Sequence, residues 1–202
     1  MQQAGNKLQP KHENPIDILC VRFASAVSPS LYKMGATPNM ITTFSLLASL
    51  YAVWNIYVGG RKKWFVIWAI LAYLFDCIDG HFARRYNMCT VFGDYYDHIS
   101  DWVYFIALFY VAFWVRGFTP AGKKYKPYII AALVLTGLGA MLHMGFQEDI
   151  YAKKSESPTL NIFKRISKTV CTVSAKCAET SRWFGVGTFI ATTIFVVALW
   201  IR

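Results

Sequence analysis

The sequence predicts an all-α membrane protein: a polytopic bundle of five transmembrane helices, or six, with an amphipathic surface helix at its N-terminal side. First, 55% of the 202 residues are hydrophobic and 17% are aromatic, whereas the apolar share of a soluble domain is about 45–50%. Second, predominantly apolar stretches of about 20 residues, the length that crosses a bilayer, recur along the chain. The net charge of +10 comes mostly from Lys and Arg between these stretches. We therefore interpret it as basic loops facing anionic headgroups, with no nucleic acid as a partner.

The chain begins with a polar segment, residues 1–15, which lacks the apolar core of a signal peptide. We expect a mobile tail there, followed by a single membrane-embedded domain over residues 16–202. Residues 16–33 are moderately apolar but carry three charged side chains, so they are expected to lie along the membrane surface. The predicted spans are residues 40–59, 64–84, 93–115, 127–147 and 183–201.

Two short basic stretches, "GGRKKW" and "RGFTPAGKKYKP", are expected to be loops between spans, because their Gly and Pro residues interrupt helices. Glu148 and Asp149 are expected to end the fourth span in water. Residues 157–182 place apolar side chains at near-helical spacing among Lys and Arg, which favours a surface helix. A solvated linker is the alternative, and deeper insertion of this region would give the sixth span.

Lys and Arg also indicate the orientation. With the N-terminus in the cytosol, thirteen of them lie on the cytosolic side and eight on the other, the bias expected of a membrane protein. In a eukaryotic cell the membrane would be that of the endoplasmic reticulum. The five cysteines are an odd number and imply no disulfide framework.

The acidic residues are concentrated in one place. The chain has 11, and nearly half lie in "DCIDGHFARRYNMCTVFGDYYDHISD", between two apolar runs. These residues are Asp76, Asp79, Asp94, Asp97 and Asp101. Residues three or four apart share a helix face, so the acids form one stripe at the end of the second span and another at the start of the third. The two spans are antiparallel with a short connection, so the stripes can face each other.

Four or five converging carboxylates cannot all remain ionised at a membrane interface without nearby positive charge. Two divalent ions would supply four positive charges, and all-oxygen ligands suit Mg²⁺ or Mn²⁺ better than zinc. The small residues Gly80, Ala83 and Gly93 leave room for a large ligand, and Arg84 suits a phosphate. Helix-capping aspartates are the structural alternative, but capping explains one or two acids and not four on facing stripes. The pattern indicates chemistry on a phosphate ester.

The pattern Asp76-x2-Asp79-Gly80-x2-Ala83-Arg84-x8-Gly93-x3-Asp97-x3-Asp101 resembles the full motif of the CDP-alcohol phosphatidyltransferase family. The preceding "TPNMIT" also resembles the start of that family's first span. The resemblance covers residues 37–115 well, and further along it is a match of hydropathy alone. It implies an enzyme of phospholipid synthesis that binds a CDP-linked alcohol at the cytosolic face. Such an enzyme passes the phosphate-bearing group to a lipid or small-alcohol acceptor and releases CMP.

Carried onto this chain, the resemblance makes Asp76, Asp79 and Asp97 ligands of two Mg²⁺ or Mn²⁺ ions. Asp101 would complete the ligand set and act as the general base on the acceptor hydroxyl. Six residues would surround the nucleotide and its diphosphate: Asn39, Thr42, Gly80, Ala83, Arg84 and Gly93. The resemblance also implies membrane lipids and a second copy of the chain, in a homodimer, as partners.

The branch of the family stays open at this point. Arg85, Asp94 and His98 match the aminoalcohol phosphotransferases, and Asp94 and His98 could be acceptor or accessory residues. The length matches the compact branch instead, which uses CDP-diacylglycerol and usually has six spans. Other interpretations are a catalytically silent member of the same fold, a membrane prenyltransferase, for which a second Asp cluster is missing, and a divalent-cation transporter. The transporter would need acids along its whole path, but the first and fifth spans have none.

Overall fold

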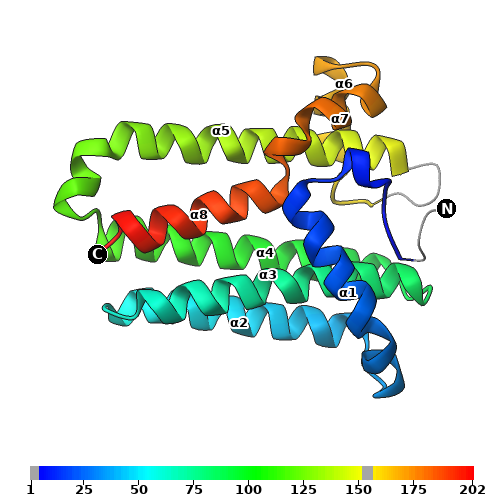
Figure 1. The fold of residues 1–202 in the computed structure, drawn as a ribbon, viewed down its shortest axis with the longest axis horizontal. Coiled ribbons are helices and arrows are strands. Elements are labelled where there is room, and N and C mark those ends of the chain that lie inside the picture. Colours follow the sequence, from blue (N-terminus) through cyan, green and yellow to red (C-terminus); the bar gives the residue numbers. More distant parts are fainter. Residues whose placement is uncertain (1–4, 152–156) are drawn as a thin grey trace.

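The computed structural model describes residues 5–151 and 157–202, and within them the fold is all-α, as predicted (Figure 1). The α-helices are α1 (Pro15–Lys33), α2 (Pro38–Val58), α3 (Lys62–Arg85), α4 (Val91–Tyr110), α5 (Pro120–Tyr151), α6 (Asn161–Val170), α7 (Ser174–Ser181) and α8 (Val186–Trp200). Three short helical segments accompany them: η1 (Pro10–His12), η2 (Val111–Arg116) and η3 (Arg182–Phe184). The β-structure of the described residues amounts to one bridge between Phe118 and Ile201.

Five helical segments are long and apolar enough to cross a membrane, which confirms the predicted number within the described residues. They are Pro38–Val58, Lys62–Arg85, Val91–Arg116, Pro120–Tyr151 and Ser174–Trp200. Helices α2, α3, α4, α5 and α8 run roughly along the long axis of the molecule, α1 crosses one end of the bundle, and α6 and α7, the latter at the start of the fifth segment, lie beside the end of α5 (Figure 1). This is a multi-pass membrane protein. The two short helices α6 and α7 replace the sixth span that was the alternative.

Threonine caps set where three spans begin. The Thr37 hydroxyl accepts a hydrogen bond from Met40 N at the start of α2, and the Thr90 hydroxyl accepts one from Gly93 N at the start of α4. The fourth span starts earlier than the sequence predicted. Gly122 N donates to Thr119 Oγ1 over 3.0 Å, and the residue after this cap is proline, which suits the first helical position. Thr-Pro is therefore a helix start, and the predicted loop over residues 116–127 is partly helical.

Packing divides the bundle into two halves. The larger core lies in the half remote from the acidic stripes and includes Ile56, Phe65, Leu108 and Val197, each with almost no exposed surface. A smaller core joins α1, α2 and α3 at the other half, around Phe82. Many large apolar side chains of the spans stay exposed, such as Trp54 at 50%. Such exposure is expected where lipid replaces water.

The segment over α6 and α7 is a surface segment attached to α5. Asp149 holds both helices, because its carboxylate pairs with Lys168 Nζ at 2.7 Å and accepts a hydrogen bond from Ser174 Oγ at 2.8 Å. The apolar residues Ile162, Ile166 and Val170 of α6 are exposed. A disulfide joins Cys171 and Cys177, which the odd number of cysteines did not predict, because spacing alone does not show that the turn between α6 and α7 brings them together.

Residues 5–14 also differ from the sequence prediction, which expected a mobile tail over residues 1–15. We call residues 5–14 the N-terminal strap, because they lie against the ends of α3 and α5. Leu8, His12 and Asn14 are buried there. Asn14 caps α1 through its side chain, so the strap is fixed at the point where it enters the first helix. Residues 1–4 lie outside the described part.

Candidate active site

The two acidic stripes converge as the spacing predicted. Asp76 and Asp79 come from α3 and Asp97 comes from α4, and one carboxylate oxygen of each lies within 4.8 Å of the other two. Asp79 is 4% exposed, and its Oδ2 atom makes no hydrogen bond within the described part of the chain. Because an unpaired buried carboxylate oxygen is costly, this arrangement indicates a missing positive partner.

Asp101 lies one helical turn beyond Asp97, on the same face of α4. It lines a small cavity of about 50 Å³ on the membrane side of the cluster, together with Asp76, Asp97 and Tyr73. Asp101 is therefore close to the cluster but is not one of its three converging members. Asp101 therefore lies next to the three converging carboxylates without belonging to their group.

A larger pocket of about 370 Å³ opens on the other side of the cluster, toward the connections at the site end of the bundle. Its lining includes Asp79 and Asp97. It also includes all six residues that the resemblance assigned to the nucleotide and its diphosphate: Asn39, Thr42, Gly80, Ala83, Arg84 and Gly93. The structure therefore brings the predicted binding residues and two of the predicted metal ligands to one pocket.

Gly80 leaves room for the Arg84 side chain. A β-carbon built at residue 80 would lie 3.1 Å from Arg84 Nη1, closer than most side-chain contacts allow. The absence of a side chain therefore lets the guanidinium lie across α3 at the pocket wall. Arg84 Nε donates to the Gly5 carbonyl over 3.0 Å, which fixes the side chain from the strap.

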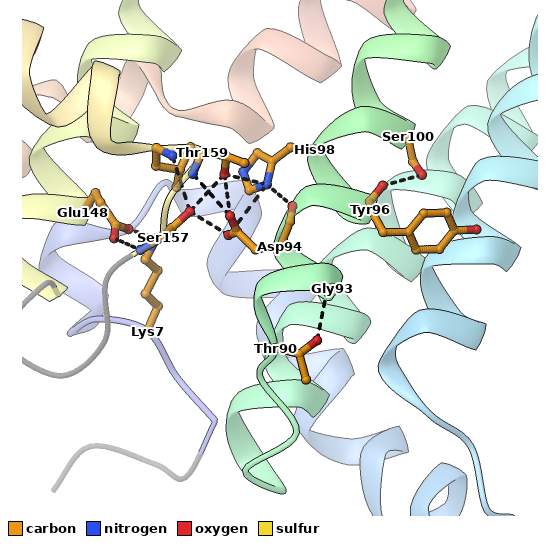
Figure 2. A network of polar contacts seen from close by, with 11 residues as sticks. Lys7, Thr90, Gly93, Asp94, Tyr96, His98, Ser100, Glu148, Ser157 and Thr159 are labelled. Atoms are coloured by element: carbon orange, nitrogen blue, oxygen red, sulfur yellow. Dashed lines mark hydrogen bonds and ion pairs between the residues drawn. The ribbon is translucent and has the colours of Figure 1, made fainter.

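Asp94 and His98 have structural partners at the pocket rim (Figure 2). The Asp94 carboxylate accepts hydrogen bonds from Ser157 Oγ (2.6 Å), Thr159 Oγ1 (2.7 Å) and Thr159 N (3.3 Å). His98 Nδ1 lies 3.1 Å from Thr159 Oγ1 and 2.7 Å from the Asp94 carbonyl oxygen. These contacts dock the segment that begins at Ser157 on the start of α4, and all three side chains of Asp94, His98 and Ser157 line the pocket.

The same pocket is also lined by Lys7, Glu148 and Tyr151, which were not predicted from the sequence. Glu148 was expected to end a helix in water, but it is 1% exposed. Its carboxylate pairs with Lys7 Nζ at 2.9 Å and accepts a hydrogen bond from Ser157 N at 2.8 Å. These partners are remote in the sequence, so no local pattern signals their contact.

The donor set fits a hard divalent cation. All three converging ligands are carboxylates, with the separation of a shared ion site. None of Asp76, Asp79, Asp97 and Asp101 forms a salt bridge to another described residue, so the negative charge of the cluster is not neutralised by Lys or Arg. The Asp cluster can hold a metal ion.

Residues 35–201 match the family model described as CDP-alcohol phosphatidyltransferase. The chain belongs to the CDP-alcohol phosphatidyltransferase family. The match extends well beyond residues 37–115, where the motif resemblance was clear, and reaches the end of α8. The match therefore covers all five candidate membrane spans.

Curated relatives are similar over part of their length. An archaetidylinositol phosphate synthase of Pyrococcus horikoshii is 28% identical over 96 residues, 48% of this chain and 46% of the relative. A phosphatidylinositol phosphate synthase of Mycobacterium tuberculosis is 28% identical over 124 residues, 56% of this chain and 51% of the relative. A phosphatidylinositol phosphate synthase of Mycobacteroides abscessus is 31% identical over 115 residues, which are 55% of this chain and 51% of the relative. The matched region thus spans about half the length of these relatives. No solved structure gives a significant match.

Proposed function

We propose that this chain is a metal-dependent transferase that moves a substituted phosphate group from a CDP-linked alcohol to an acceptor hydroxyl and releases CMP. One observation carries the proposal: the carboxylates of Asp76, Asp79 and Asp97 converge, and two of them, Asp79 and Asp97, line a pocket that also holds every predicted nucleotide-binding residue. A protein that served only as a scaffold would need the fold, but it would not need carboxylates beside a set of nucleotide-binding residues. The family membership supports the same reaction class.

Asp76, Asp79 and Asp97 would hold two Mg²⁺ or Mn²⁺ ions, with Asp101 completing the ligand set. Bound there, the ions would neutralise the diphosphate and stabilise the leaving CMP oxygen. Arg84 donates charge-assisted hydrogen bonds to phosphate oxygens. Asn39 and Thr42 are polar side chains at the start of α2 in the same pocket, where they can bind and orient the nucleotide.

Asp101 is proposed as the proton acceptor. The acceptor hydroxyl oxygen forms a bond to the phosphorus that carries the alcohol, while the bond from that phosphorus to the CMP oxygen breaks. The hydroxyl proton passes to an Asp101 carboxylate oxygen, and CMP leaves with the electron pair of the broken bond. Asp101 suits this role because it lies beside the cluster, on the membrane side, where a lipid-linked or small alcohol can reach the reacting phosphorus.

Three residues match the aminoalcohol phosphotransferases: Arg85, Asp94 and His98. Their contacts support the compact branch, which uses CDP-diacylglycerol. Arg85 donates to the Ser25 carbonyl at 2.8 Å and so ties α3 to α1. Asp94 and His98 hold the segment after α5. These structural roles account for the three residues without an aminoalcohol substrate. The names of the relatives describe synthases of phosphatidylinositol phosphate and archaetidylinositol phosphate, so a phosphorylated inositol is the acceptor to test first.

By the predicted topology, thirteen Lys and Arg lie on the side of the N-terminus and eight on the other side, which favours a cytosolic active site. In a eukaryotic cell we expect the endoplasmic reticulum membrane. A homodimer and contact with membrane lipids, implied by the resemblance, complete the proposal.

The test is release of CMP by the purified chain in liposomes. CDP-diacylglycerol and CDP-choline are supplied in turn with Mg²⁺ or Mn²⁺ and a panel of acceptors: inositol phosphate, inositol, glycerol phosphate, serine and diacylglycerol. We expect CMP release that needs both an acceptor and the metal, with the lipid product identified by mass spectrometry. Binding of CDP without turnover on any pair would indicate a catalytically silent member of the fold. Accumulation of the metal inside the liposomes without CMP release would indicate a transporter.

A further inference from the structure

The N-terminal strap is held in place by hydrogen bonds to residues of α5, η3 and α8. Gln147 Nε2 donates to the His12 carbonyl (3.1 Å) and to Glu13 Oε2 (2.9 Å). Asn14 Nδ2 donates to the Arg182 carbonyl (2.7 Å) and to Thr188 Oγ1 (2.8 Å). The strap is therefore attached to α5, η3 and α8, and its path is set by the bundle.

From these attachments the strap extends to the pocket wall. Gly5 has a φ of 94°, and a β-carbon there would lie 2.6 Å from the buried ring of His81, so only glycine allows the backbone to lie this close to α3. The Gly5 carbonyl in turn accepts the hydrogen bond from Arg84 Nε. The strap thus contacts the one arginine that the family motif places at the diphosphate.

Two residues further along, the Lys7 side chain lines the pocket itself. Its ammonium lies 2.9 Å from the Glu148 carboxylate and 5.6 Å from the centre of the Tyr151 ring, and both of these residues also line the pocket. Among the described residues, four carboxylates line it: Asp79, Asp94, Asp97 and Glu148. The lysine and arginine side chains of the same described lining are Lys7 and Arg84. A substrate with phosphate groups would therefore find a cationic partner on the strap as well as Arg84 on α3.

We propose that the N-terminal strap is a wall of the substrate pocket and that Lys7 binds a phosphate group of the substrate. This inference rests on the proposed function, since it needs a phosphate-bearing substrate in this pocket. The phosphate belongs either to the CDP-linked donor or to a phosphorylated acceptor, and the same ammonium chemistry serves both. Glu148 orients the ammonium, and the hydrogen bond from Arg84 to the Gly5 carbonyl links the strap to the second cation of the pocket lining.

The main variant is Lys7→Met combined with Glu148→Gln. Lys7→Met alone would leave a buried carboxylate without its cation, and a loss of stability could then be mistaken for a loss of binding. The double variant removes both charges and should unfold near the temperature of the parent. Lys11→Met is the matched control, because Lys11 is an exposed lysine of the same strap and does not line the pocket. Lys7→Arg tests whether positive charge is sufficient.

The readouts are the dissociation constants of CDP, CMP and cytidine in Mg²⁺, and KM and kcat for the acceptor. If Lys7 binds the donor, the double variant raises the dissociation constant of CDP by about tenfold or more. The dissociation constant of CMP then rises less, and that of cytidine stays unchanged. If it binds an acceptor phosphate, nucleotide affinities stay unchanged, and KM rises about tenfold for a phosphorylated acceptor but not for its unphosphorylated form. Lys7→Arg keeps part of the affinity, and Lys11→Met behaves as the parent does.

The inference is overturned if the double variant binds every nucleotide and acceptor as the parent does. It is also overturned if Lys7→Met lowers only the unfolding temperature and Glu148→Gln restores it with full affinity, because Lys7 then serves only to pair Glu148. A parent chain that binds no CDP and releases no CMP would instead refute the proposed function, and this inference with it.

Discussion

The two ends of the helix bundle carry opposite kinds of charge. All ten acidic residues of the described part lie toward the site end, and residues 18–75, 102–147 and 183–202 contain none. The opposite end carries eight cationic residues and no acid: Arg61, Lys62, Lys63, Arg116, Lys123, Lys124, Lys126 and Arg202. At that end the cations can meet anionic headgroups at the membrane surface. At the site end, Lys and Arg are more numerous but leave the central carboxylates without an ion pair among the described residues.

This difference between the two ends indicates the role of the carboxylates. Acids placed for solubility or helix capping would be distributed over both ends and would be paired or exposed. Here they converge at one depth, and one of them, Asp79, is buried without a partner for its Oδ2 atom in the described chain. A cation path across the membrane would need ligands in the far half as well, so the one-sided distribution favours a site that binds metal for chemistry over a transporter.

The largest effect is expected from Asp76→Asn or Asp79→Asn. Each removes a charge from the cluster, so CDP affinity in Mg²⁺ and CMP release should fall together, turnover by at least about 100-fold. Chelation of the metal should reproduce this loss in the parent. Nucleotide titration and a CMP-release assay measure both quantities. The matched control neutralises the far end with Lys123→Gln, Lys124→Gln and Lys126→Gln, for which we expect parental kcat. A comparable loss of CMP release in this triple variant would contradict the functional difference between the two ends.

Asp101→Asn comes next and should separate binding from turnover. Its carboxylate lies beside the cluster on the membrane side, so the variant should still bind CDP in Mg²⁺, at reduced strength. A positioned base typically contributes 10²–10⁴-fold, and turnover should fall by about that factor. The same two assays compare it with Asp76→Asn. Near-normal turnover would mean that another group takes the proton, with His98 or Asp94 as the first candidates.

Asp94→Ala should have a smaller effect, on stability and on the pocket rim. It removes three hydrogen bonds to Ser157 and Thr159, which together should cost about 3 kcal/mol of unfolding free energy. Because these bonds hold a pocket-lining segment, KM should also rise. Asp149→Ala is the control, since it removes the contacts to Lys168 and Ser174 outside the pocket. It should lower the unfolding temperature and leave KM unchanged. Equal KM values in the two variants would assign Asp94 to stability alone.

The sequence predicted the spans and the facing acidic stripes well, because both depend on local periodicity. About 20 apolar residues identify a span, and acids three and four apart on adjacent antiparallel helices must face each other once the connection is short. The helical start at Thr119 was missed because Thr-Pro resembles a turn as much as a cap. The strap was missed for a different reason. Its residues are polar, and they are buried by contacts with Gln147, Arg182 and Thr188, which only the folded bundle brings near them.

The strap also gives the smallest predicted effect, a dependence of stability on pH. Burial, together with the nearby charge of Asp17, raises the pKa of Glu13 to about 7. The folded state then holds a proton that the unfolded chain, with its ordinary carboxyl pKa, has already lost. Stability should therefore fall as the pH rises from about 4.5 to 7, and the loss should be complete above pH 7.

Glu13→Gln removes this ionisation and keeps an oxygen that can accept the hydrogen bond from Gln147 Nε2. The variant should unfold at a higher temperature than the parent at pH 8, with a gain of at most about 3 kcal/mol, and at nearly the same temperature at pH 4. Burial also raises the pKa of Asp17 to about 6, and Asp17 is present in both the parent and the variant. Thermal unfolding in detergent between pH 4 and 8 measures the difference between them. A difference independent of pH would mean that Glu13 stays ionised in the folded chain and that the strap is less tightly packed than its contacts indicate.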